Sequence, residues 1–263
     1  MAVFCYPINM NEHREQHLSP ERMKGEQVAS MVKEVFDKFP FEVTQHLVDS
    51  NVVLTLAGMK GQTEFFIDVP DESQDERIIQ GINELSQKLQ SIDSNIIMRL
   101  EREPFPAASD GVRTMMVNVL NLSTLEEWIQ KTKLCDLPKF DKSQGFAGFD
   151  KWREDVVEKF GEDSDEQEMG VGVRKGYPDQ AILDFIDWYN TGREKVKEDA
   201  KILNTGLYDE AQPIYSYYAE HANDPEIVDN VNRSSEILAG FYQSQWHKEI
   251  APRLEFKKGR NLE

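Results

Sequence analysis

The sequence predicts an α+β fold, with an N-terminal antiparallel sheet and its covering helices followed by an all-α helical domain. In the N-terminal half, short segments rich in Val, Phe, Leu and Thr are separated by turn residues, a pattern typical of strands. In the C-terminal half, apolar residues recur at helical spacing. Strands gathered in one half of the chain indicate an antiparallel sheet covered by helices, and not a parallel, doubly wound sheet.

The length of 263 residues exceeds the commonest single-domain size of roughly 100–150, so we expect two domains. Proline and glycine cluster between Leu137 and Gly148, where the apolar periodicity lapses. This composition is typical of a linker, and we place the boundary near residue 142. The predicted organisation is an irregular lead-in over residues 1–25, an α+β domain over 26–142 and an all-α domain over 143–263.

The predicted α+β domain begins with a helix that Pro40 terminates, followed by a three-stranded antiparallel meander. A second helix with a stripe of Ile and Leu comes next, then two strands and a third helix. In order, these elements are Glu26–Phe39 (helix), Phe41–Val48, Asn51–Ala57 and Thr63–Val69 (strands), Gln74–Ile92 (helix), Ser94–Leu100 and Val112–Leu120 (strands) and Thr124–Lys133 (helix).

Residues 176–190 carry the clearest helix signal in the chain. Pro178 suits a first helical position, and Asp179 places negative charge at the positive end of the helix dipole. Apolar residues recur from Ala181 to Tyr189, with acidic residues on the flank, so we expect a largely buried helix.

Other segments of the predicted all-α domain are less regular. The acidic run Glu162–Glu168 predicts a solvated loop, since it lacks the alternation and central glycine of a calcium-binding loop. The glycine-rich segment Gly170–Gly176 predicts a flexible connector, since its spacing does not match a dinucleotide-binding fingerprint. Further helices are predicted at Phe149–Phe160, Arg193–Leu203, Tyr208–Glu220, Pro225–Ser235 and Glu236–Ile250.

The formal net charge of −18 is shared about equally between the two halves of the chain. Such a field repels phosphate backbones and anionic lipids, which argues against nucleic-acid binding and against work at a membrane surface. No stretch reaches the roughly 18 apolar residues of a membrane span, and the N-terminus lacks the features of a secretory signal. We therefore expect a cytoplasmic protein.

No local motif of nucleotide binding or acyl transfer occurs in the sequence. The weak candidates for catalysis are the carboxylates and imidazoles of four C-terminal residues, which would have to converge on one pocket. They are Glu220, His221, Asp224 and His247. Without paired ligand spacing among them we predict neither a metal site nor a cofactor.

Tyrosine and tryptophan are concentrated in the C-terminal half, where they serve either as core or as anchors of a protein interface. The candidate partner-binding residues are Tyr215, Tyr218, Tyr242 and Trp246. We predict a binding or regulatory protein that acts through contact with another protein, with a basic surface as the favoured partner, and leave its oligomeric state open. The alternatives are a metal-assisted or acid/base hydrolase, and an acidic mimic of nucleic acid that inhibits a basic protein.

Overall fold

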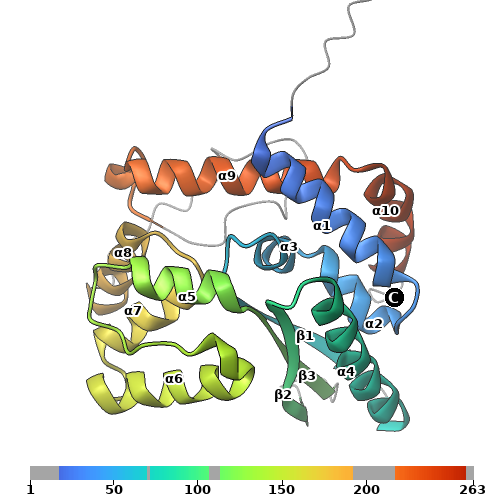
Figure 1. Cartoon of the computed structure of the whole chain (residues 1–263), viewed down its shortest axis with the longest axis horizontal. Helices are drawn as coiled ribbons and strands as arrows, with labels where there is room; N and C mark the ends of the chain where they lie inside the picture. Colours follow the sequence, from blue (N-terminus) through green and yellow to red (C-terminus); the bar gives the residue numbers. More distant parts are fainter. Residues whose placement is uncertain (1–17, 70–71, 107–112, 192–216, 259–263) are drawn as a thin grey trace, which may run out of the picture.

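The computed structural model describes residues 18–69, 72–106, 113–191 and 217–258 of the chain. Helices surround a small antiparallel sheet, which confirms the α+β fold class (Figure 1). No helix within these ranges is long and apolar enough to cross a membrane.

The sheet contains β1 (Gln62–Val69), β2 (Ile96–Pro106) and β3 (Arg113–Asn121), in the order β1-β3-β2 with both pairings antiparallel. The strands predicted at Thr63–Val69, Ser94–Leu100 and Val112–Leu120 are therefore confirmed. Because side chains alternate between the two faces of a strand, each face of this sheet has its own chemistry. Phe65, Ile67 and Val117 point into the main core, whereas Glu64, Arg99 and Asn118 lie in one row on the opposite face.

The prediction of the first two strands of the meander is wrong. Residues 41–48 form a short helix, α2 (Phe41–Thr44), and a 3-10 turn, and residues 50–56 form α3 (Ser50–Leu56). Val52, Val53, Leu54 and Leu56 are all buried, so α3 is covered on every side. A short, continuous apolar run fits a buried helix as well as a strand, and burial of this extent overrides the modest β preference of valine.

The main core joins helices from both ends of the chain to one face of the sheet. It packs α1 (Pro20–Phe36), α3 and α4 (Asp75–Ile92) together with α9 (Pro225–Tyr242) and α10 (Gln245–Lys258). The helices predicted at Glu26–Phe39 and Gln74–Ile92 correspond to α1 and α4, with shifted boundaries. The predicted division between Pro225–Ser235 and Glu236–Ile250 is wrong, because α9 continues to Tyr242 and α10 begins at Gln245.

Helices α1 and α9 cross in close contact, as Figure 1 shows. The contact is made by a glycine on each helix. A Cβ on Gly25 would lie 2.0 Å from the Ile237 carbonyl oxygen, and one on Gly240 would lie 2.1 Å from the Arg22 carbonyl oxygen. Only glycine therefore permits this backbone approach.

A second core covers one end of the opposite face of the sheet. It contains α5 (Leu122–Lys131), α6 (Gly145–Phe160), α7 (Asp165–Arg174) and α8 (Asp179–Thr191), which gather on the left of Figure 1. Ile97 and Leu120 are the sheet residues in this core. Beyond them, the same face of the sheet carries the polar row of Glu64, Arg99 and Asn118 and the exposed Phe66.

The loop predicted at Glu162–Glu168 and the connector predicted at Gly170–Gly176 are wrong, because most of both segments forms α7. Ser164 caps this helix, its hydroxyl accepting from the Gln167 N–H at 3.1 Å. Acidic residues of the run then lie in the first turn, where the helix dipole favours negative charge. Gly172 packs against Ile182, and a Cβ there would lie 2.6 Å from that side chain. Gly172 thus serves helix packing.

The division near residue 142 stays a prediction. In the structure, α9 and α10 share the main core with α1 and α4, while α5 shares the second core with α6–α8. Helix α6 corresponds to Phe149–Phe160 and α5 to Thr124–Lys133, and the Asn121 side chain caps α5. The predicted helix Arg193–Leu203 and most of Tyr208–Glu220 lie outside the described residues, as does most of the lead-in.

Candidate ligand-binding groove

The structure does not bring the four catalytic candidates together. Asp224 caps α9, its carboxylate accepting from the backbone N–H groups of Glu226 and Ile227. Glu220 is exposed, and His221 lies near the same end of α9. His247 lies beyond the other end of this 18-residue helix, roughly 27 Å away at 1.5 Å per residue.

His221 is bound to an aspartate of α8. Its Nδ1 lies 2.7 Å from the Asp184 carboxylate, which also accepts from the Tyr218 N–H at 2.7 Å and from the Gln180 side chain. The Tyr218 hydroxyl donates to Asp187 at 2.8 Å. These bonds attach the segment that contains Tyr218 and His221 to α8.

The expectation that α8 is largely buried by its aromatic stripe is wrong in part. Asp184, predicted on the flank, is 2% exposed, whereas Tyr189 is 72% exposed. The carboxylate tolerates burial because several donors satisfy it. The spacing of apolar residues in α8 does not predict this burial, since two of the groups bound to Asp184, the Tyr218 N–H and His221, come from a segment more than thirty residues away.

His247 is packed against the rings of Phe241 and Tyr242 and is 4% exposed. Burial lowers the pKa of His247 below that of a free histidine. Across the described part of the chain, no group of three or more His, Cys, Asp or Glu side chains is placed to hold a metal ion.

The described aromatic candidates for partner binding are buried. Tyr242 donates its hydroxyl to the Val48 carbonyl at 2.9 Å, and Trp246 packs edge-on against Phe36. Tyr218, Tyr242 and Trp246 are 4%, 6% and 8% exposed, so they contribute to packing of this chain. Tyr215 lies outside the described residues.

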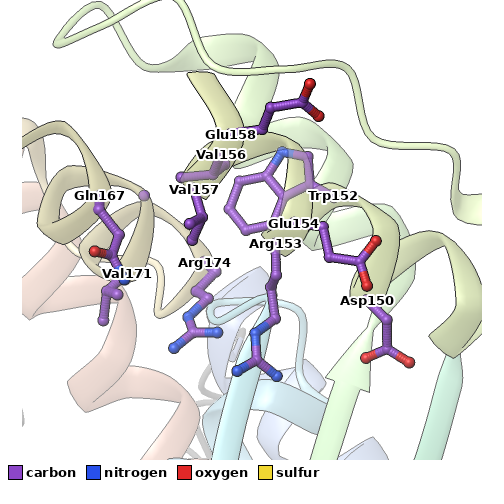
Figure 2. Close-up of a pocket in the computed structure, with 11 residues that line it drawn as sticks. Asp150, Trp152, Arg153, Glu154, Val156, Val157, Glu158, Gln167, Val171 and Arg174 are labelled. Carbon is purple, nitrogen blue, oxygen red and sulfur yellow. The ribbon is translucent and has the colours of Figure 1, made fainter. Parts of the chain in front are cut away.

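A groove between α6 and α7 offers a different site. Its volume is about 760 Å³, within the range of small-molecule and peptide pockets. One wall is apolar, with Trp152, Val156, Val157 and Val171, while Arg153 and Arg174 project side by side from the two helices (Figure 2). The remaining lining residues are Asp150, Glu154, Glu158, Gln167 and Gly170.

The two arginines differ in their partners. Both guanidinium groups lie near the buried Phe149 ring, with Cζ at 5.7 Å from its centroid for Arg153 and 5.8 Å for Arg174. Arg153 forms an ion pair with Glu101 at 3.0 Å. Arg174 forms no ion pair or hydrogen bond through its side chain with any described residue, and its Nε is buried without a partner. Burial, followed by the like charge of Arg153, lowers the pKa of Arg174 to about 10.

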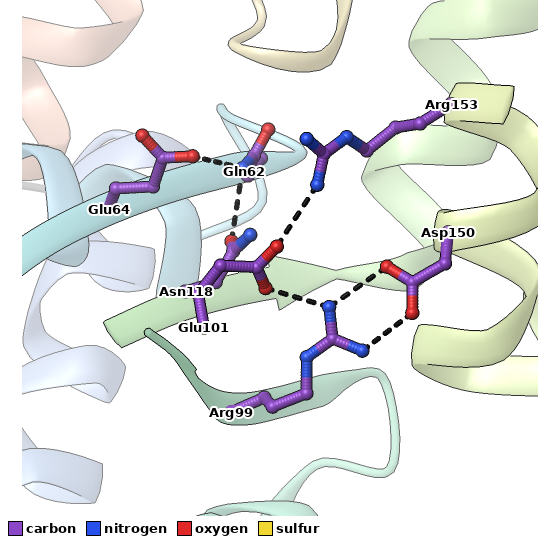
Figure 3. Close-up of polar contacts among 7 residues, drawn as sticks. All are labelled: Gln62, Glu64, Arg99, Glu101, Asn118, Asp150 and Arg153. Atoms are coloured by element: carbon purple, nitrogen blue, oxygen red, sulfur yellow. Dashed lines mark hydrogen bonds and ion pairs between the residues drawn. The ribbon is translucent and has the colours of Figure 1, made fainter. Parts of the chain in front are cut away.

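A network of ion pairs connects α6 to the polar face of the sheet (Figure 3). Arg99 binds Asp150 through two nitrogens, at 2.6 and 2.9 Å, and Glu101 at 2.7 Å. The hydrogen bond from Arg99 lowers the pKa of the Asp150 carboxyl. Glu101 thus holds Arg99 and Arg153 together, and fixes α6 above β2.

Two amide side chains that are buried on the same face of the sheet each leave one polar atom without a hydrogen bond. Gln62 donates to Glu64 at 2.9 Å and to Asn118 at 3.1 Å, which leaves Gln62 Oε1 and Asn118 Nδ2 without a partner among the described residues (Figure 3). A 180° flip of the Gln62 amide would place its oxygen against the Glu64 carboxylate, and the two acceptors would repel each other. The orientation of the Gln62 amide is therefore fixed. Most buried polar atoms in proteins form hydrogen bonds, so these two atoms can each accept or donate one more.

Two guanidinium groups beside an apolar wall are an arrangement that can bind and orient a ligand. Sequence reasoning missed the groove, because Arg174 belongs to the glycine-rich segment predicted as a connector and Arg153 carries no local signature. Comparisons of the chain with models of protein families, with curated proteins and with solved structures found no match.

Proposed function

We propose that this chain is a binding protein that acts through contact with another protein, and that the groove between α6 and α7 receives a segment of that partner. The observation that supports this is the combination of an apolar wall with Arg174, a cation without an ion pair among the described residues. Apolar area supplies affinity and a fixed charge supplies orientation. The net charge of −18 favours encounter with a partner that is basic as a whole.

The test is an affinity capture from the native cell lysate, repeated with two matched variants of the full chain. Val157→Glu places a charge on the apolar wall of the groove, and Val228→Glu places the same charge on α9, where Val228 is 39% exposed. We expect specific proteins to be retained by the unmodified chain and by Val228→Glu, and lost from Val157→Glu. Equal retention by both variants, with unchanged circular dichroism, would contradict a partner site in the groove.

A further inference from the structure

Arg174 carries a positive charge that the described part of the protein does not neutralise. Three carboxylates act on it through their charge, and none forms an ion pair with it: Glu101 binds Arg99 and Arg153, Glu64 accepts from Gln62, and Glu168 acts through its charge alone. The negative charge of these carboxylates raises the pKa of Arg174, but burial and the positive charge of Arg153 together lower this pKa by more. A desolvated cation of this kind is stabilised when an anion enters its site.

The geometry favours a compact, planar oxyanion. A guanidinium presents a fork of N–H donors that matches the two oxygens of a carboxylate, and no described residue accepts a hydrogen bond from the Arg174 side chain, whose Nε is buried. Arg153 lies beside it in the groove and contributes positive potential while paired with Glu101 (Figure 2). Stacking near the Phe149 ring restricts both guanidinium groups before any ligand binds.

The charge balance favours a carboxylate over a phosphate. Arg174 is the one arginine lining the groove that lacks an ion pair with a described residue, so a single negative charge compensates it. A doubly charged phosphate would bring a second charge close to Asp150, Glu154 and Glu158, which also line the groove.

We infer that Arg174, assisted by Arg153, forms an anion subsite that binds one side-chain carboxylate of the protein segment in the groove, an inference that rests on the function proposed above. The apolar neighbours of that acidic residue lie against Val157 and Val171. The partner segment is therefore acidic at one position and apolar beside it, although the partner as a whole is basic.

The direct test uses the unmodified full chain and sodium acetate as the probe, at constant ionic strength maintained with chloride. The readout is the nuclear magnetic resonance signal of the Arg174 Nε–H group, assigned by its loss in Arg174→Gln. We expect a saturable downfield shift of this signal with a dissociation constant in the millimolar range. Absence of a saturable shift would overturn the subsite.

Two variants and a second probe sharpen the result. Arg174→Gln should weaken acetate binding at least tenfold, measured as the shift of the Arg153 Nε–H signal, whereas Arg77→Gln, an exposed arginine paired with Glu42, should leave it unchanged. Equal weakening by both variants would overturn the assignment. Inorganic phosphate should bind more weakly than acetate, and tighter binding of phosphate would overturn the choice of a carboxylate.

Different experimental outcomes would contradict the proposed partner site and the proposed carboxylate subsite. If acetate binds Arg174 while Val157→Glu retains every partner, the subsite stands and the partner site in the groove is wrong. If Val157→Glu loses the partner while acetate does not bind, the groove is the partner site and the carboxylate subsite is wrong.

Discussion

Replacing Lys60 by methionine should stabilise the protein. Lys60 is 6% exposed, with its Nζ 2.7 Å from Asn51 Oδ1 and 5.1 Å from the centre of the Tyr177 ring. No described carboxylate lies within ion-pair distance of it. Burial, and to a lesser extent the charge of Lys175, lowers the pKa of Lys60 from 10.5 to about 7.

The magnitude follows from this shift in pKa. A difference of about 3.5 pH units at 1.36 kcal/mol per unit corresponds to a penalty of about 5 kcal/mol for keeping Lys60 protonated in the folded state. Methionine has a similar length and removes the penalty, at the cost of about 1 kcal/mol for the lost hydrogen bond to Asn51. We therefore expect a gain of about 3–4 kcal/mol in the free energy of unfolding at pH 7.

The pH dependence provides a second, independent signature. Because the pKa of Lys60 is lower in the folded than in the unfolded chain, the unfolded chain binds more protons between pH 7 and 10.5. The stability contributed by this group therefore rises with pH across that window, by up to about 1.4 kcal/mol per pH unit, and is constant below it. In Lys60→Met this rise should disappear.

The assay is urea unfolding followed by circular dichroism, at intervals from pH 6 to 10. Lys139→Met is the matched control, because Lys139 is exposed, and it should change neither the free energy of unfolding nor its slope with pH. A Lys60→Met variant that is less stable than the unmodified protein at pH 7, or that keeps the rise between pH 7 and 10, would refute the assignment of a strained, buried lysine.

Three further variants test other parts of the fold by the same unfolding assay. Gly240→Ala should cost about 3 kcal/mol or more, because the new Cβ meets the Arg22 carbonyl oxygen and separates α1 from α9; an unchanged unfolding midpoint would contradict that contact. Asp184→Asn should cost about 1–3 kcal/mol by weakening the bond to His221, and a neutral effect would show that this bond does not stabilise the fold. Burial lowers the pKa of His247, so stability should fall as the pH drops through about 6.5, and a His247→Phe variant that keeps the same fall would exclude this group as its origin.

The sequence permits prediction of elements whose pattern has one interpretation. The apolar stripe of α4 and the strand at Thr63–Val69 are of this kind, and both are confirmed. The short apolar runs around Val43 and Val53 fit a strand or a buried helix equally well, and only their burial in the main core decides between the two.

The groove could not be predicted, for a different reason. Arg153 and Arg174 are twenty-one residues apart and meet only because α6 and α7 pack together, and Glu101, which pairs with Arg153, comes from the sheet. An arginine without a partner looks the same in a sequence as one in an ion pair. The aromatic residues were open to two interpretations, and burial of Tyr242 and Trp246 favours packing over an interface.

The crossing of α1 and α9 also has a consequence for synthesis of the protein. Ser19 and Glu236, which are hydrogen-bonded where these helices meet, are 217 residues apart. At roughly 5–20 residues per second, the ribosome completes α9 about 10–40 seconds after α1 has been made. During that interval the apolar face of α1, which includes Val28 and Val32, is not yet covered by the residues that bury it in the folded protein. The contact between α1 and α9 can therefore form only late in synthesis, and α1 stays accessible to chaperones that shield apolar surfaces throughout that interval.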